Sequence, residues 1–118
     1  MQRLTAIDYP LVTRACQLIR EQACAGLIIS KLTSELGVSK SLFYARFKRA
    51  LNRLPHEEIL RTRLEHAQSL LRQGTLSAQE IASRCGFTHP EYLTVTFKRE
   101  LGVTPGAFRR RDKQLRVV

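Results

Sequence analysis

The sequence has no long apolar run and few prolines, and each shortage excludes a class of protein. No stretch of about 18 consecutive apolar residues occurs, so we expect no membrane-spanning helix. The first residues lack the charged-then-apolar order of a secretion signal. Since proline occurs only four times and serine is dispersed, we expect no long linker or low-complexity segment.

Cysteine and histidine occur three times each, and their positions argue against a metal site. The three cysteines are odd in number and lack metal-ligand spacing, and the three histidines form no ligand pair on one helix face. These residues are Cys16, Cys24, Cys85, His56, His66 and His89. We expect the cysteines to be small buried side chains in a reducing cytoplasm, and we expect neither a metal nor a cofactor.

Acidic residues are too few to balance the basic ones. Twenty lysines and arginines face ten aspartates and glutamates, which gives a net charge of +10 and a pI near 10.4. A field of that strength attracts a polyanion, and DNA is the commonest one. A merely solubilising surface stays open as an alternative. A membrane-surface helix would need a continuous apolar face, whereas the apolar faces here are expected to lie in the core.

One segment of the sequence occurs twice. Residues 32–55, LTSELGVSKSLFYARFKRALNRLP, are similar to residues 81–105, IASRCGFTHPEYLTVTFKRELGVTP. Gly37 pairs with Gly86 at an offset of 49, and the offset becomes 50 inside the second helix of each copy. Each copy reads as a helix, a glycine turn and a second helix that ends in a basic pair. This is the outline of a helix-turn-helix, which lays its second helix in the major groove of DNA.

Apolar periodicity and capping residues predict an all-α fold with seven helices and no strand. The expected helices span about 9–24, 31–36, 40–51, 55–73, 78–85, 89–101 and 105–111. Ser30 and Ser39 are expected to cap the second and third helices, and Ser77 with Glu80 forms a capping box for the fifth. Gly102 is expected to stop the sixth helix.

These helices predict two helix-turn-helix units joined by a long central helix. The 118 residues suit one domain, or two very small ones that share a core. The expected parts are a first unit at 9–54, a connecting helix at 55–73, a second unit at 74–112 and a frayed tail at 113–118. A helix of roughly 19 residues is about 28 Å long, and major-groove faces repeat about every 34 Å. One chain could therefore read two successive grooves without a dimer.

The stretch GFTHPEYLTVTFKRELGVTP, residues 86–105, resembles the signature of the AraC/XylS family of bacterial transcription regulators. The spacing Arg63-x3-Ala67-x2-Leu70-Leu71, followed by Ile81-Ala82, also fits the long helix and second unit of that family, and the resemblance extends over about residues 10–112. Within the family, residues 12–71 look most like the xylose-operon regulators, especially from Ile19-Arg20 through Cys24-x-Gly26.

The resemblance implies a bacterial activator that works in the cytoplasm at the nucleoid and contacts RNA polymerase. It also implies that such a module often follows a ligand-sensing domain. No sensing domain fits in these residues, so we expect either a stand-alone regulator or a DNA-binding domain of a larger protein. The operator, the inducer and the choice between activation and repression stay open.

Two positions depart from the family pattern. Leu54-Pro55 stands where the family usually has a polar cap before proline, so the start of the central helix is expected to be less firmly fixed. The family often has arginine, which can grip guanine, where this chain has Ala45 and Val95. Small apolar groups at these positions can pack only against a thymine methyl.

The outward faces of the two second helices coincide under the repeat. The first outward face consists of Ser41, Tyr44, Ala45 and Lys48, and the second of Glu91, Thr94, Val95 and Lys98. The opposite, inward faces consist of Phe43, Phe47 and Leu51, and of Leu93, Phe97 and Leu101. A solvated helix face is the alternative reading for any one outward residue, but the agreement of the two copies favours DNA contact.

Base reading and phosphate contact are assigned to different residues. The expected base-reading residues are Ser41, Tyr44, Ala45, His89, Pro90, Glu91, Thr94 and Val95. The expected phosphate contacts are Ser39, Lys40, Lys48, Thr88, Lys98, Arg109 and Arg110, with Ser39 and Thr88 at helix N-termini. Several other arginines, among them Arg53, Arg61 and Arg99, are expected to be solvated or paired with nearby glutamates.

The sequence favours a sequence-specific regulator that binds double-stranded DNA and is not an enzyme. An enzyme of this size would need a zinc-bound cysteine cluster, an activated thiol or paired acids. The adjacent Glu57-Glu58 point to different faces of one helix. A nonspecific nucleic-acid-binding or architectural module remains the alternative, and a flat sequence preference would support it.

Overall fold

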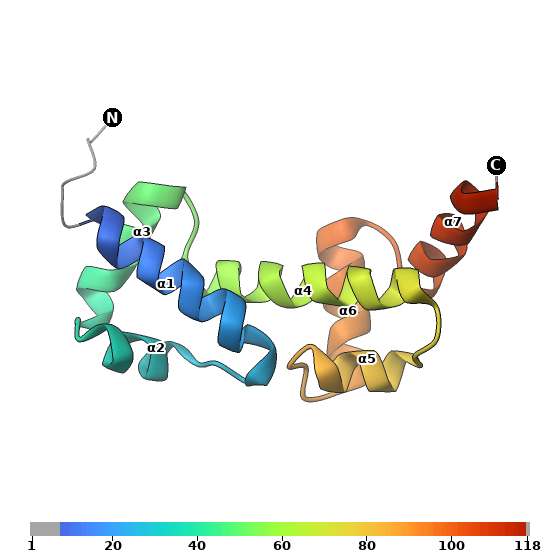
Figure 1. The fold of residues 1–118 in the computed structure, drawn as a ribbon, viewed down its shortest axis with the longest axis horizontal. Coiled ribbons are helices and arrows are strands. Elements are labelled where there is room, and N and C mark those ends of the chain that lie inside the picture. The colour runs from blue at the N-terminus through green and yellow to red at the C-terminus, as the bar shows by residue number, and fades with distance from the viewer. Residues whose placement is uncertain (1–7, 118) are drawn as a thin grey trace. The chain divides into compact units, whose positions relative to one another are not determined.

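The computed structural model describes residues 8–117, and within them every regular element is a helix (Figure 1). The elements are α1 (Asp8–Gln22), the 3-10 helix η1 (Ala23–Ala25), α2 (Ile29–Leu36), α3 (Lys40–Leu51), α4 (Pro55–Gln73), α5 (Ala78–Arg84), α6 (Pro90–Leu101) and α7 (Pro105–Val117). The all-α, seven-helix prediction is confirmed for these residues. The chain divides into two compact units, residues 1–62 and 63–118, so that α4 contributes to both.

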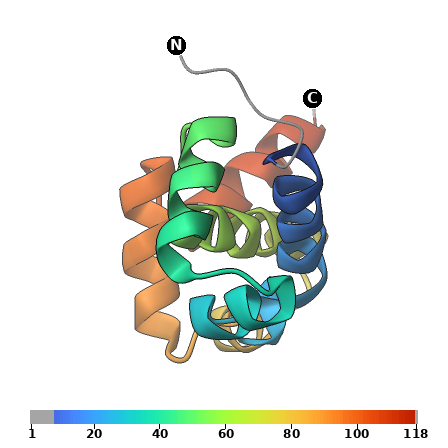
Figure 2. The same cartoon turned by 90° about the vertical axis from the view of Figure 1, so that its left-hand side faces the viewer.

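The first unit is built from α1, α2, α3 and the start of α4 (Figures 1 and 2). Its aromatic centre is Phe43 and Phe47, both fully buried on the inward face of α3. Their rings meet edge to face, with centroids 5.5 Å apart. Ile59 of α4 belongs to the same cluster. The predicted inward face of this helix is therefore confirmed, and burial of the two rings fixes which side of α3 is left for solvent.

The second unit repeats this plan with α5 and α6. Leu93 and Phe97 are fully buried on α6, as predicted. The ring of Phe97 meets that of Phe108 of α7 edge to face at 5.5 Å. The prediction for Leu101 was wrong, because its side chain is 39% exposed. Leu101 is the last residue of α6, and the chain turns away at Gly102 in the left-handed conformation.

The ends of α3 and α6 show the repeat in the backbone itself. Asn52 and Gly102 are 50 positions apart and both adopt the left-handed conformation, with φ of 56° and 79°. The N–H of each donates 2.8 Å to the carbonyl of a lysine one turn back, Lys48 or Lys98. Left-handed backbone is open to glycine and tolerated by asparagine, so the two copies end their second helices in the same way.

Helix starts follow the predicted caps at two of three positions. The hydroxyl of Ser39 accepts from the N–H of Leu42 at 3.2 Å, and that of Ser77 accepts from the N–H of Glu80 at 3.1 Å. The prediction for Ser30 was wrong. The helix α2 begins at Ile29, two residues before the predicted start at 31, after the extended residue Ile28, and it has no side-chain cap.

The last helix is longer than predicted, since α7 continues to Val117 rather than ending at 111. The expected frayed tail is therefore helical as far as Val117, and Val118 lies outside the described residues. Two contacts join this helix to α4. Asp112 lies 3.8 Å from Arg72 of α4, whose guanidinium also covers the Phe108 ring at 5.3 Å. Such contacts between charged side chains leave no apolar period in the sequence.

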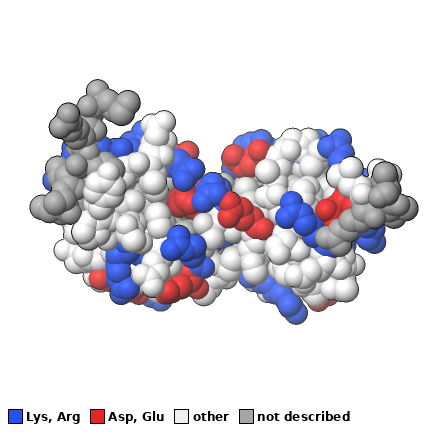
Figure 3. Space-filling view, turned by 45° about the horizontal axis from the view of Figure 1, so that its top comes forward, with Lys and Arg blue, Asp and Glu red and all other residues white. Residues whose placement is uncertain are grey.

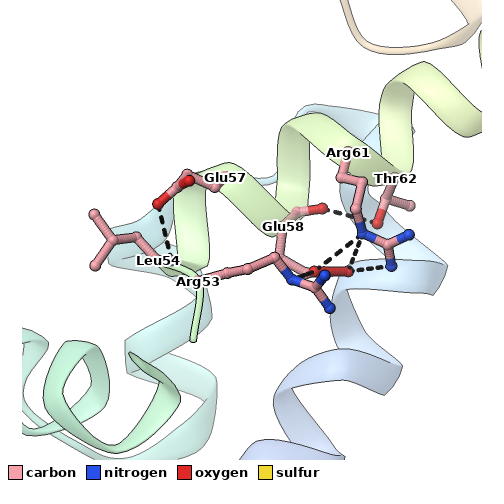
Figure 4. A network of polar contacts seen from close by, with 6 residues as sticks. All are labelled: Arg53, Leu54, Glu57, Glu58, Arg61 and Thr62. Atoms are coloured by element: carbon pink, nitrogen blue, oxygen red, sulfur yellow. Dashed lines mark hydrogen bonds and ion pairs between the residues drawn. The ribbon is translucent and has the colours of Figure 1, made fainter. Parts of the chain in front are cut away.

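The start of α4 is fixed by two acidic side chains in its first turn, rather than by a cap residue before the helix (Figure 4). A carboxylate oxygen of Glu57 accepts from the N–H of Leu54 at 3.0 Å. The carboxylate of Glu58, only 6% exposed, lies between two arginines, 2.7 Å from Nε of Arg53 and 3.0 Å from Nε of Arg61. The expectation of a loosely held start, based on Leu54, was wrong because these two glutamates replace the missing cap.

Candidate nucleic-acid interface

Three of the four residues on the predicted outward face of α3 are exposed, and the fourth is half-buried. Ser41, Ala45 and Lys48 are exposed. Tyr44 is half-buried, because its ring packs against the core and meets Phe43 edge to face at 6.4 Å. Tyr44 therefore has one side fixed by the core, and only the remainder of its phenol can reach a ligand.

The outward face of α6 is open at all four predicted positions: Glu91, Thr94, Val95 and Lys98. Val95 is 62% exposed, so its methyl groups lie in solvent, although isolated apolar groups prefer burial. An exposed valine at this place suits contact with a thymine methyl. The hydroxyl of Thr94 donates 3.2 Å to the carbonyl of Pro90, one turn back on the same helix, which orients that side chain.

The entry into α6 differs from the prediction. Residue 89, rather than Thr88, occupies the cap position, with extended backbone before Pro90 at the first helical position. Proline disfavours helical backbone in the residue before it, and the residue inserted into the second copy makes His89 the counterpart of Ser39. Thr88 and His89 are exposed and Pro90 is half-buried. No side chain caps α6, so Thr88 does not serve as its cap.

Most of the predicted phosphate contacts lie at the surface. Lys40, Lys48, Lys98 and Arg110 are exposed, and basic side chains reach the surface of both units in the view of Figure 3. The hydroxyl oxygen of Ser39 accepts from the N–H of Leu42 in capping α3, and this bond leaves its O–H proton able to donate.

Arg109 makes contacts within the protein that the sequence did not predict. Its guanidinium donates to two backbone carbonyls of the same unit, that of Leu76 at 2.6 Å and that of Leu71 at 3.4 Å. Leu71 lies in the last turn of α4, and Leu76 lies between α4 and α5. The side chain is half-buried, and these bonds hold α7 in place. Its phosphate contact stays a prediction.

Several arginines are paired with glutamates, as predicted, and these pairs reduce the free positive charge. Glu58 holds Arg53 and Arg61 in the first unit. In the second unit Arg99 donates 3.1 Å to the carboxylate of Glu100. The paired guanidiniums are less available for phosphate than the exposed lysines, because their charge is already compensated nearby.

One feature of this surface was not predicted from the sequence. The Tyr44 hydroxyl lies 3.5 Å from Nδ1 of His56, the second residue of α4, and the two ring centroids are 6.2 Å apart. The ammonium of Lys40 lies 5.7 Å from the centre of the Tyr44 ring. Lys40, Tyr44 and His56, here called the tyrosine stack, thus link two helices at the surface of the first unit. Their spacing in sequence gave no signal of this contact.

The cysteines offer little reactivity. Cys85 is fully buried, as predicted, whereas Cys16 and Cys24 are half-buried, so that prediction was only partly right. Burial, and then the nearby carboxylate of Glu58, raises the pKa of the Cys16 thiol, although arginines at 20, 53 and 61 act in the opposite direction. A raised pKa leaves less thiolate, the nucleophilic form.

Known proteins with similar sequences include helix-turn-helix transcription regulators. A family model described as a helix-turn-helix domain matches residues 32–111. The xylose operon regulatory protein of Haemophilus influenzae is 34% identical over 100 residues, covering 85% of this chain and 26% of the relative. A putative AraC-like transcription regulator of Streptomyces antibioticus is 32% identical over 107 residues, covering 91% of this chain and 35% of the relative.

One solved structure with a similar fold is a complex with DNA. The DNA-binding domain of the global transcriptional factor AdpA, in complex with a target DNA, is 29% identical with a TM-score of 0.77. The match covers 92% of this chain and 95% of that domain. No helix in the described part of the chain is long and apolar enough to cross a membrane.

Proposed function

Since this chain belongs to the AraC family of helix-turn-helix DNA-binding domains, we propose that α3 and α6 are its recognition helices and enter successive major grooves. The chain is a sequence-specific DNA-binding domain of a transcription regulator, and the proposal concerns how it reads its site.

The observation that carries the proposal is the equivalence of the two outward faces. Each lies opposite a pair of buried side chains at matching positions, Phe43 and Phe47 on α3 and Leu93 and Phe97 on α6. A helix of 19 residues such as α4 is roughly 28 Å long, close to the groove repeat of about 34 Å.

Bases are read by side chains of both helices. Val95 and Ala45 contact thymine methyls, and Glu91 accepts from the amino group of cytosine or orients a neighbouring arginine. Ser41, Tyr44 and Thr94 supply hydroxyl groups for base edges or phosphates, and His89 and Pro90 touch the DNA where α6 begins. These eight residues are Ser41, Tyr44, Ala45, His89, Pro90, Glu91, Thr94 and Val95.

Phosphates are held by exposed cations and helix N-termini. The proposed set is Ser39, Lys40, Lys48, Thr88, Lys98, Arg109 and Arg110. The lysines and arginines of this set predict a steep loss of affinity with salt, because each phosphate that a cation neutralises releases condensed counterions. Backbone contacts of this kind fix the register of the protein on the duplex and carry no sequence information.

The complete regulator is proposed to act through components in addition to this DNA-binding domain. The chain spans about a quarter of the length of the xylose operon regulatory protein it matches, 26%. A ligand-sensing domain outside these residues, and RNA polymerase as the partner in activation, are the proposed further components. The proposed place of action is the bacterial cytoplasm, at the nucleoid.

The experiment is selection of bound duplexes from a random library, followed by footprinting on the selected site. The proposal expects a bipartite site whose halves lie about one helical turn apart, protected by a monomer. A footprint confined to one groove turn, or binding that requires a dimer, would contradict the proposed mode. A flat selection profile would favour a nonspecific architectural module instead.

A further inference from the structure

In the tyrosine stack, a residue of α4 contacts a side chain on the outward face of α3. Tyr44 is the one large polar side chain among the proposed base-reading residues of α3. Its ring is held on the core side by Phe43, with centroids 6.4 Å apart. Its hydroxyl, the group that could bond a base edge, lies 3.5 Å from Nδ1 of His56 on α4. The direction of the phenol is therefore set by one contact within α3 and one contact with α4.

His56 is well suited to this task. It is exposed, so it contributes little to the core, and it is the second residue of α4, whose start is fixed by Glu57 and Glu58. Neutral imidazole can accept from the Tyr44 hydroxyl, and imidazolium can donate to it. Either form of the ring keeps the two groups together.

The second unit holds its equivalent side chain in another way. At an offset of 50, the counterparts of Lys40, Tyr44 and His56 are Pro90, Thr94 and Gly106, so no member of the stack is retained. The hydroxyl of Thr94 is instead oriented by its own helix, through the carbonyl of Pro90 at 3.2 Å. Each unit thus orients the hydroxyl at this position, but only the first unit uses a residue of another helix.

We propose that His56 is a positioning residue, which fixes the Tyr44 phenol through the tyrosine stack and thereby sets the base preference of the first helix-turn-helix unit. This inference rests on the proposed function, namely that α3 reads bases. A tyrosine free to rotate would lose orientational entropy when it binds a base and could bond several bases. A held tyrosine presents its hydroxyl oxygen in one direction, which favours one base over the others.

The test compares base preferences of wild type, His56→Ala, His56→Asn and Tyr44→Phe, by selection from libraries randomised in each half-site. The variants Ala45→Arg and Val95→Arg mark which half-site α3 reads and which α6 reads. His56→Ala is expected to lower discrimination in the α3 half-site by about three- to tenfold, the scale of one hydrogen bond, and to leave the α6 half-site unchanged. Tyr44→Phe is expected to have the same effect.

Rescue separates positioning from a general structural role. Asparagine places an amide near the position of Nδ1, so His56→Asn is expected to restore most of the discrimination. His66→Ala is the matched control, because His66 is also an exposed histidine of α4, and its profile should equal that of wild type. Thermal unfolding of each variant shows whether any change in preference follows loss of stability.

The outcomes distinguish this inference from the function on which it rests. A wild-type protein that selects no sequence would overturn both. A selected bipartite site with an α3 half that is indifferent to His56→Ala, or equal losses in both halves, would overturn the positioning role alone. Failure of His56→Asn to restore discrimination would also count against it.

Discussion

The carboxylate of Glu58 lies 2.7 Å from Nε of Arg53 and is 6% exposed, whereas the arginine is 41% exposed. A nearly buried acid is thus paired with a cation at the surface. Arg61, on the same helix as Glu58, donates to the same carboxylate (Figure 4). The three side chains fasten the first turn of α4 to the segment that follows α3, and so connect the central helix to the first recognition helix.

Glu58→Gln is expected to destabilise the first unit, because an amide cannot compensate two guanidiniums. We expect a loss of about 1–3 kcal/mol in the free energy of unfolding. That is less than the roughly 3–5 kcal/mol of a fully buried pair, since both arginines are about half exposed. Urea unfolding measures the loss. Glu57→Gln is the control, because glutamine can still accept from Leu54. An equal cost for the two variants would show that the pairing with Arg53 and Arg61 contributes nothing.

Phe47→Ala and Phe97→Ala are each expected to cost about 3–5 kcal/mol of stability, the usual range for a buried aromatic side chain. Both rings are fully buried, so DNA binding should be lost through unfolding rather than through lost contacts. Leu101→Ala is the matched control, since that side chain is 39% exposed and its removal should cost clearly less. Circular dichroism melts that leave either phenylalanine variant as stable as wild type would contradict the assignment of inward faces.

Lys98→Ala is expected to weaken binding to all sequences about equally, because an exposed lysine on α6 is proposed to contact phosphate. The slope of log affinity against log salt should fall in magnitude by about one unit. Titrations at several salt concentrations give the slope. Lys31→Ala, at an exposed position on α2 that belongs to neither outward face, should leave the slope unchanged. A loss of affinity confined to one base sequence would instead make Lys98 a base-reading residue.

The fold was largely predictable because its signals are local. The bounds of α4 matched the prediction from Pro55 to Gln73, since proline, an apolar stripe and glycine mark that helix in sequence. The buried faces of α3 and α6 followed from helical spacing, apart from Leu101 at a helix end. The two copies of the repeat supported each other, because a pattern that occurs twice at fixed offset rarely arises by chance.

Several features that the sequence did not predict depend on contacts between residues far apart in sequence. Arg109 looked like one more surface cation, yet it donates to carbonyls 33 and 38 residues away. Asp112 of α7 likewise contacts Arg72 of α4, 40 residues earlier in the sequence. The contact of Tyr44 with His56 joins two helices through side chains that no spacing rule connects. Such interactions require the tertiary structure.

The central claim is that the outward faces of α3 and α6 each read one half of a bipartite site, and Val95→Arg tests it most directly. The side chain of Val95 is 62% exposed, so an arginine can be accommodated without disturbing the core. A bidentate arginine–guanine pair contributes about 1–3 kcal/mol of discrimination. In randomised-site binding profiles, we predict a shift toward guanine at one or two adjacent base pairs of one half-site, with the other half unchanged. Identical profiles for wild type and Val95→Arg would contradict the account, because they would mean that this face of α6 does not enter the groove.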